Sequence, residues 1–164
     1  MKNMQKLKKI SIILLSVLLI VCFIGCTSDK TYPTDEAGII KRLKNVSGII
    51  EIESVTEETD PNQILGKPDA YTAAVYFSYD QIDQDEYTGS LIEDGVIRGG
   101  KIELYPTHEG AIYRDNYLSA LGAAFGGHYH TVLNTMVIRT SKKLTSTQHE
   151  ELEKKIISAM TKAK

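Results

Sequence analysis

The feature that most constrains this chain is its first 25 residues, which are basic and then apolar. Four lysines lie within the first nine residues, and no acidic residue comes before Asp29. Residues 10–25 are then nearly all apolar, interrupted by Ser11 and Ser16. A basic start followed by a short apolar core is typical of a secretory signal peptide. The apolar run is also slightly shorter than the roughly 17–25 residues that a membrane-spanning helix needs. We therefore interpret residues 1–25 as a signal peptide.

The tetrapeptide Phe23-Ile24-Gly25-Cys26 ends the apolar run. It resembles the bacterial lipobox, in which an apolar, a variable and a small residue precede a cysteine. The resemblance implies that the Cys26 thiol receives a diacylglyceryl group and that cleavage leaves Cys26 as the first residue of the mature chain. Two acyl chains hold a protein at a bilayer where one chain is marginal. The expected location is the extracytoplasmic face of the cell membrane, with membrane contact through this lipid anchor. The alternative, an uncleaved N-terminal anchor with an incidental cysteine, also places the domain outside the cytoplasm.

Removal of residues 1–25 changes the charge of what remains. Four of the 19 basic residues and none of the 21 acidic residues leave. The remaining chain then has 15 basic and 21 acidic residues, and its net charge is −6 instead of −2. An acidic domain is a poor candidate for nucleic-acid binding, which needs clustered lysine and arginine. Cys22 leaves with the signal, so the folded part has no disulfide and its core must supply the stability alone. Secreted domains of this size often carry disulfides, and their absence favours a Gram-positive envelope.

We expect residues 26–34 to be the lipidated N-terminus and a polar tether, and residues 35–164 to form a single domain. Apolar periodicity, caps and β-branched runs indicate the order helix, strand, strand, strand, helix, strand, helix. The expected strands are 48–53, 71–78, 99–105 and 131–140, and the expected helices follow Thr34 or Asp35, Thr107 and Thr145. Helices packed on one face of a small sheet are the simplest arrangement that is consistent with this order of elements. The predicted fold is α+β, a two-layer sandwich with a mainly antiparallel sheet of three to four strands.

Three stretches resemble a family of small, uncharacterised lipoproteins of Gram-positive bacteria. They are DPNQILGKPDAYTAAVYFS (60–78), GGKIELYPTHEGAIYRDNYLSAL (99–121) and HTVLNTMVIRTSKKLTSTQHEELEKKI (130–156). The family pattern has glycine where this chain has Asn134, and more Asp and Asn where it has residues 57–59. The resemblance implies the envelope location and the fold, and it implies no activity.

The loop before the second expected strand carries four oxygen-bearing side chains within six residues: Glu57, Glu58, Asp60 and Asn62. Calcium prefers such carboxylate and amide oxygens, so this loop is a candidate ligand or cation site. The regular spacing, turning glycine and terminal acid of an EF-hand loop are missing. The alternative is that Asp60 and Asn62 form side-chain turns around Pro61 and hold the loop rigid.

His128 and His130 are two residues apart, so on a strand both would face the same side. Two imidazoles on one face can begin a zinc site if a third ligand joins them. His108 or His149 could supply that ligand if the fold brings it close. The alternative is a pair of exposed histidines at the end of a strand.

The sequence contains no G-x-S-x-G elbow, His-Glu-x-x-His motif or glycine-rich phosphate loop. Glu103 and Asp115 are interpreted as lone surface carboxylates, and the acidic residues 80–94 as an exposed connection. We therefore expect a non-enzymatic binding domain with no cofactor and with an unknown envelope protein as its partner. A metal-dependent envelope enzyme using His128 and His130, or an accessory subunit of a membrane complex, are the alternatives.

Overall fold

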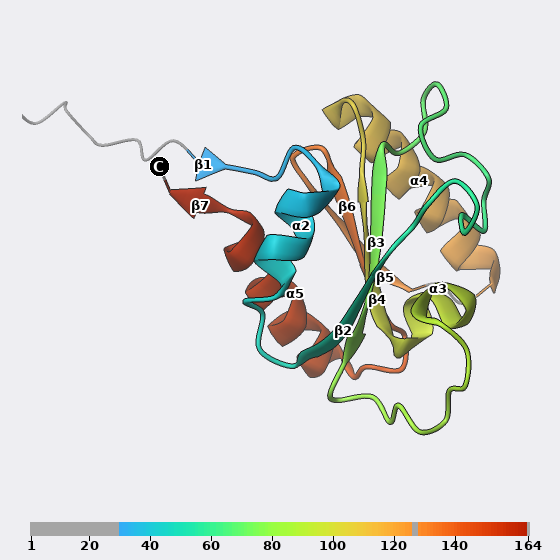
Figure 1. Ribbon diagram of the computed structural model, residues 1–164, viewed down its shortest axis with the longest axis vertical. Helices are drawn as coiled ribbons and strands as arrows, with labels where there is room; N and C mark the ends of the chain where they lie inside the picture. Colours follow the sequence, from blue (N-terminus) through green and yellow to red (C-terminus); the bar gives the residue numbers. More distant parts are fainter. Residues whose placement is uncertain (1–29, 126–127, 164) are drawn as a thin grey trace, which may run out of the picture. The chain divides into compact units, whose positions relative to one another are not determined.

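A computed structural model describes residues 30–125 and 128–163, in which a five-stranded sheet is the central element (Figure 1). Its strand order is β2-β3-β4-β6-β5, and every pair of neighbouring strands is antiparallel. The strands are β2 (Ile49–Ser54), β3 (Ala73–Tyr79), β4 (Gly99–Leu104), β5 (Tyr129–Leu133) and β6 (Met136–Thr140). The helices are α2 (Glu36–Leu43), α3 (Leu91–Asp94), the 3-10 turn η1 (Gly95–Arg98), α4 (His108–Phe125) and α5 (Ser146–Met160).

Helices cover both faces of the sheet. Helices α2 and α5 pack on one face, and α3 and α4 on the other (Figure 1). Two separate clusters of buried apolar side chains fill the two interfaces. The α+β class with a mainly antiparallel sheet is confirmed. The structure differs from the expected two layers because β3, β4 and β6 are buried on both faces, and it has five strands instead of three to four.

The first core explains the two helices that the sequence predicts best. Thr145 caps α5 and forms a capping box with Gln148, as expected. Leu152, Ile156 and Met160 are fully buried against the sheet. A stripe at this spacing puts one side of the helix against the sheet. Asp35 caps α2 by accepting a hydrogen bond of 2.7 Å from the Gly38 backbone N–H.

The single strand expected over 131–140 is instead a hairpin of β5 and β6. The chain reverses at Asn134, which has a φ of +56°. Asparagine and glycine tolerate this left-handed conformation better than other residues. Asn134 therefore permits the turn that separates β5 from β6 without a glycine.

The acidic stretch 80–94 is more ordered than an exposed connection. Ile82, Leu91 and Ile92 are buried, and Ser90 with Glu93 forms a capping box at the start of α3. Arg98 fixes the end of the stretch by donating to the backbone carbonyl oxygen of Gly89, 3.1 Å away. Helix α3 is too short for its apolar residues to show a helical period, so the pattern did not predict it. The Ser-x-x-Glu signature of a capping box was nevertheless present at its start.

The ends of the folded unit, Lys30–Lys162, lie together. Short strands β1 (Lys30–Thr31) and β7 (Lys162–Ala163) form a second sheet. The Arg42 guanidinium donates to the carbonyl oxygen of Thr31 at 2.9 Å and to that of Met160. Tyr32 and Pro33 of the predicted tether are not free of the body, since Pro33 is buried and Tyr32 packs against the first core.

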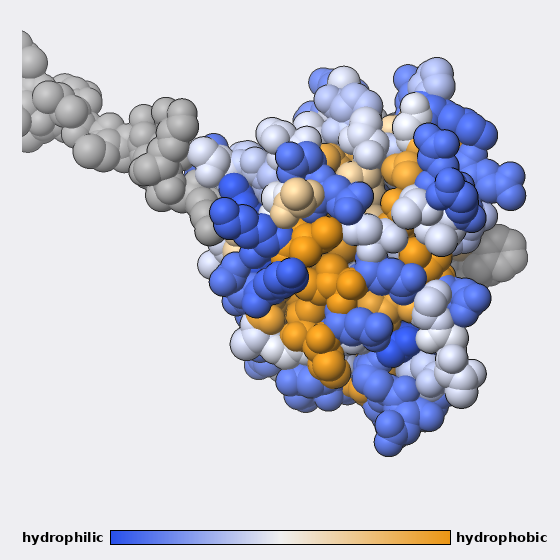
Figure 2. All heavy atoms as spheres, viewed as in Figure 1, coloured by the Kyte–Doolittle hydropathy of each residue, from blue (hydrophilic) through white to orange (hydrophobic). Residues whose placement is uncertain are grey.

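Edge strand β2 carries the most exposed aliphatic residue of the sheet, Ile50, with an exposed fraction of 62%. Figure 2 shows apolar atoms gathered on the face where Figure 1 places α2 and β2. Among the described residues, no helix combines the length and the apolar character that crossing a bilayer requires. The signal peptide and Cys26 lie outside the described residues.

Candidate functional site

The candidate site begins with the alternation of side chains along β4. Ile102 and Leu104 belong to the first core, as the sequence predicts. Lys101 and Glu103 therefore point to the opposite face, which the sequence suggests is solvent. Helix α4 covers that face, and both charged side chains are fully buried. The interpretation of Glu103 as a lone surface carboxylate is thus wrong.

Glu103 is surrounded by three cations from three elements. The Lys101 Nζ atom lies 3.1 Å from Oε1 of Glu103. Arg114, on α4, donates from Nε to Oε2 at 2.9 Å and from Nη2 to Oε1 at 3.1 Å. Nη1 of Arg139, on β6, lies 3.6 Å from Oε1. This cluster of Lys101, Glu103, Arg114 and Arg139, called the buried charge cluster below, carries more positive than negative charge.

The sheet register explains why these residues meet. Lys101 pairs with Tyr76 of β3 on one side and with Arg139 of β6 on the other. Residues paired across antiparallel strands point to the same face, so the three side chains form one row. The Nζ atom of Lys101 lies 4.6 Å from the ring centroid of Tyr71 and 4.9 Å from that of Tyr76. The two ring faces partly replace the water that the ammonium has lost.

The cluster changes the protonation of its members. Burial alone would raise the pKa of Glu103, but the charges of Lys101, Arg114 and Arg139 outweigh it and lower this pKa to about 2. Burial holds the pKa of Lys101 below its usual value even though Glu103 opposes the shift. Glu103 is therefore ionised throughout the physiological range and holds the cations together.

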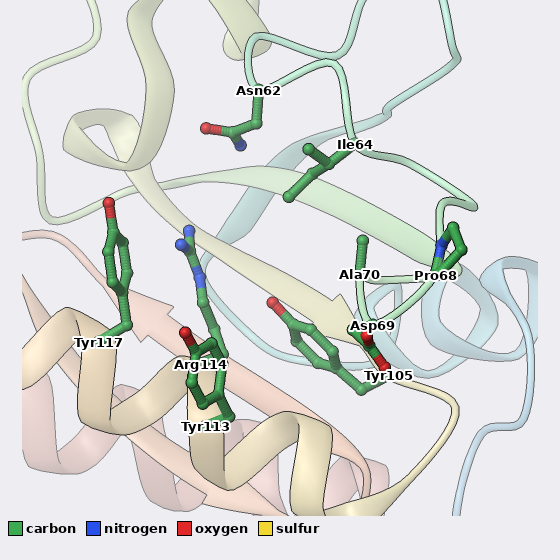
Figure 3. Close-up of a pocket in the computed structure, with 9 residues that line it drawn as sticks. All are labelled: Asn62, Ile64, Pro68, Asp69, Ala70, Tyr105, Tyr113, Arg114 and Tyr117. Atoms are coloured by element: carbon green, nitrogen blue, oxygen red, sulfur yellow. The ribbon is translucent and has the colours of Figure 1, made fainter.

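Arg114 also lines an open pocket of about 350 Å³ (Figure 3). Figure 3 shows its guanidinium in the pocket between the rings of Tyr117 and Tyr105. Tyr113 and Tyr117 are 75% and 48% exposed, and the Tyr117 ring centroid lies 5.4 Å from the Arg114 Cζ atom. The remaining lining residues are Asn62, Ile64, Pro68, Asp69 and Ala70. This Arg114 pocket combines a positive charge with aromatic faces and a small apolar wall, a set that suits an acidic group attached to a ring.

The loop Thr56–Thr72 forms one wall of this pocket, and Asp60 organises it. Its Oδ2 accepts the backbone N–H groups of Ile64 and Leu65, both at 2.8 Å, and its Oδ1 accepts the N–H of Asn62 at 3.1 Å. The Tyr71 hydroxyl donates to Oδ1 as well. Burial opposes ionisation of Asp60, but these hydrogen bonds outweigh it and lower the pKa of the carboxyl. Both oxygens are thus occupied by donors.

The structure does not bring the four residues of the candidate cation loop together. Asp60 is buried and faces N–H and O–H groups, whereas Glu57 and Glu58 are exposed. Glu58 accepts a hydrogen bond of 2.8 Å from the Thr56 hydroxyl. The Asn62 amide donates to the Tyr71 hydroxyl oxygen at 3.1 Å. These contacts match the alternative in which Asp60 and Asn62 make the loop rigid.

The four histidines have separate surroundings. The Nδ1 atom of His130 lies 2.7 Å from the Asp115 carboxylate, so Asp115 is not a lone carboxylate. His149 stacks on Tyr129 and its Nδ1 lies 2.7 Å from the Thr140 hydroxyl. Within 30–125 and 128–163, no three His, Cys, Asp or Glu side chains are arranged to hold a metal ion. The structure therefore brings no third ligand to His128 and His130.

Comparison of the chain with family models, curated proteins and solved structures gives no match. Sequence reasoning missed Arg114 and Arg139, because only the fold brings them to Glu103, and it missed the tyrosines because nothing local marks them as pocket residues. One signal was available: the charged residues Lys101 and Glu103 alternate with Ile102 and Leu104, and the four are flanked by Gly100 and Tyr105.

Proposed function

We propose that this chain is a lipid-anchored extracytoplasmic domain that binds a small organic acid in the Arg114 pocket, with the acidic group of the ligand against the Arg114 guanidinium. The observation that carries the proposal is the position of the Arg114 guanidinium, which is fixed by Glu103 and yet lines an open, tyrosine-walled pocket. A fixed guanidinium loses little conformational entropy when a ligand binds, which favours recognition of a carboxylate.

The geometry leaves one edge of the guanidinium for a ligand. Glu103 takes Nε and Nη2 of Arg114, which leaves Nη1 to meet an incoming carboxylate. Glu103 compensates only one of the three cations near it. An acidic ligand would therefore add a favourable charge, whereas a basic ligand would be repelled. The exposed rings of Tyr113 and Tyr117 offer flat surfaces for the body of the ligand.

The first test compares a ring-bearing acid with its neutral analogue. We expect 3-phenylpropanoate to bind the detergent-purified full chain, and its amide to bind at least tenfold more weakly, because a hydrogen bond to a charged group contributes about 1.5–3 kcal/mol. Arg114→Gln should remove the difference between acid and amide. Calorimetry and saturation-transfer NMR measure both.

Lys154→Gln is the matched control, because Lys154 is a surface cation on α5, remote from the pocket and weakly paired with Glu150 at 3.9 Å. Glucuronate and glucose provide a second acid and neutral pair with a non-aromatic ring. Equal binding of acid and neutral forms, or binding of neither acid, would refute the proposal.

The membrane part of the proposal rests on Cys26 and is tested separately. In a Gram-positive host, Cys26→Ala should abolish the mass added by the diacylglyceryl group, because the other cysteine of the sequence, Cys22, lies inside the apolar run and not after Gly25. The variant should accumulate as unprocessed precursor or be released from the membrane. Intact-mass spectrometry of the membrane fraction measures the change. An unlipidated wild-type protein would contradict the assignment, while Cys22→Ala should be lipidated normally.

A further inference from the structure

A second hollow, of about 380 Å³, has Asn62 in its lining. It is lined by residues from the loop Thr56–Thr72, β3, the α3–η1 segment, β6 and the segments just before β5 and after β6. They are Pro61, Asn62, Tyr76, Asp94, Gly95, Val96, Ile97, His128, Arg139 and Lys142. The Arg114 pocket shares only Asn62 with it among these residues. We call it the Arg139 hollow.

Two buried nitrogen atoms in this hollow lack a hydrogen-bond partner among the described residues. They are Nε of Arg139 and Nδ1 of His128. Arg139 lines the hollow and contacts Glu103 through Nη1 at 3.6 Å, which leaves its buried Nε without an acceptor. A buried donor without an acceptor costs about 1–3 kcal/mol, and two in one cavity are uncommon. Because both nitrogen atoms belong to residues that line the same hollow, a ligand with hydrogen-bond acceptors could satisfy both of them there.

The charges around the hollow specify the sign of that group. Burial, together with repulsion from Arg139 and Lys142, lowers the pKa of His128 to about 4. Both cations are therefore close enough to His128 to act on it. The acid in the lining, Asp94, is paired with Arg98 at 3.3 Å.

We propose that the Arg139 hollow binds a tetrahedral oxyanion of the phosphate type, with Arg139 and Lys142 as its cationic contacts and His128 as a third donor. Three nitrogen-bearing groups from different parts of the chain suit an anion that presents several oxygens, which a phosphate group does better than a single carboxylate. A neutral imidazole with its proton on Nδ1 can donate to such an oxygen. The same chemistry is offered by free phosphate and by a phosphate ester on a larger molecule.

Binding of the anion must be linked to protonation of His128. The groups that face His128 across the hollow are Arg139 on β6, Lys142 after β6, Asp94 on α3 and Tyr76 on β3. Placing a dianion among them favours the imidazolium, so the bound state should have a higher His128 pKa than the free state. If anion binding raises the His128 pKa by one unit, the anion binds tenfold more tightly to the protein with His128 protonated than to the protein with His128 neutral. The gain develops as the pH falls through the two pKa values.

The test is an NMR titration of the full chain in detergent with isotope-labelled histidine. Sulfate is the pH probe, because it stays a dianion from pH 4 to 8, while inorganic phosphate and glycerol 3-phosphate are compared at pH 8. We expect the His128 ring signals to shift on addition of each anion. The His128 pKa should rise by at least one unit in saturating sulfate, and His149 should stay unchanged as the internal control.

Variants separate this hollow from nonspecific salt effects. Arg139→Gln should fold, because Glu103 keeps Lys101 and Arg114 as partners, and it should weaken sulfate binding at least tenfold. Arg139→Lys should retain part of the affinity, and Lys154→Gln should retain all of it. Tighter binding of glycerol 3-phosphate than phosphate would identify an ester as the ligand, and the reverse would identify the free ion.

The inference would be overturned if no anion shifted the His128 ring signals. It would also be overturned if the anions shifted these signals equally in the wild type and in Arg139→Gln. The readout is independent of the Arg114 pocket, where binding is followed through the ring-bearing acid. Failure of either site can therefore be recognised without the other.

Discussion

Glu103→Gln is expected to lower the free energy of unfolding by about 3–5 kcal/mol, because it leaves three buried cations without their counter-charge. Lys101, Arg114 and Arg139 all lie within 3.6 Å of the Glu103 carboxylate, and its side chain is fully buried. Since small domains are stable by only about 5–15 kcal/mol, this single change removes a large share of the total. Urea unfolding at pH 7, followed by circular dichroism, measures the loss.

The pH dependence identifies the mechanism. The pKa of Glu103 is lowered from its usual value of 4.5 to about 2, so its ionised form is favoured by folding. This contribution is present above pH 4.5 and is lost as the pH falls toward 2. The gap between wild type and Glu103→Gln should therefore narrow over the same interval. Glu150→Gln, at an exposed surface pair, should change stability by less than about 0.5 kcal/mol at any pH. A constant gap down to pH 2 would show that packing, and not charge, causes the loss.

Asp60→Ala should have the second-largest effect, about 3 kcal/mol of stability, which corresponds to a fall in Tm of roughly 10 °C. The substitution removes the acceptor for three backbone N–H groups and for the Tyr71 hydroxyl. Because Asn62 and Ile64 line the Arg114 pocket, the loss should also weaken ligand binding there. Scanning calorimetry and limited proteolysis of residues 56–72 measure the two effects.

Glu57→Ala is the matched control, because Glu57 is an exposed acid in the same loop. Asp60→Asn should fall between wild type and Asp60→Ala, since the amide keeps one oxygen acceptor but loses the charge. Added calcium should leave the Tm of the wild type unchanged, because the Asp60 oxygens already accept hydrogen bonds. A rise in Tm with calcium, or an Asp60→Ala variant as stable as Glu57→Ala, would contradict this account.

Local signals predicted the elements that depend on local energetics. The capping box of Thr145 and Gln148 and the apolar stripe of α5 are encoded within a few residues, and the structure confirms them. The hairpin of β5 and β6 was missed because its turn contains Asn134 and no glycine. The second helical layer was missed because α4 is apolar on more than one side, so its sequence does not reveal which face meets the sheet.

The candidate site was missed for a different reason. The loop-forming role of Asp60 and Asn62 was available as the alternative to a cation site, because the turn around Pro61 and the nearest N–H partners lie within five residues of Asp60. Glu103 and Arg139 are joined only by the strand register, and Arg114 reaches them only because α4 crosses that face. A single sequence contains no pairing information of this kind, so a charge in a buried row looks the same as a charge on an open surface.

The hydrogen bonds that Arg42 donates at both ends of the folded unit have a mechanical and a topological consequence. Arg42 holds the carbonyl oxygens of Thr31 and Met160 on one side chain, so the chain enters and leaves the folded unit at the same place. A short linker could therefore join the two ends, and new ends could be opened in an exposed turn, such as that at Asn134, without rerouting the sheet. By the same geometry, a protein fused after α5 would emerge beside Lys30, where the folded unit begins. Tension applied between the two ends would load Arg42 and the β1–β7 pair before it reached the five-stranded sheet.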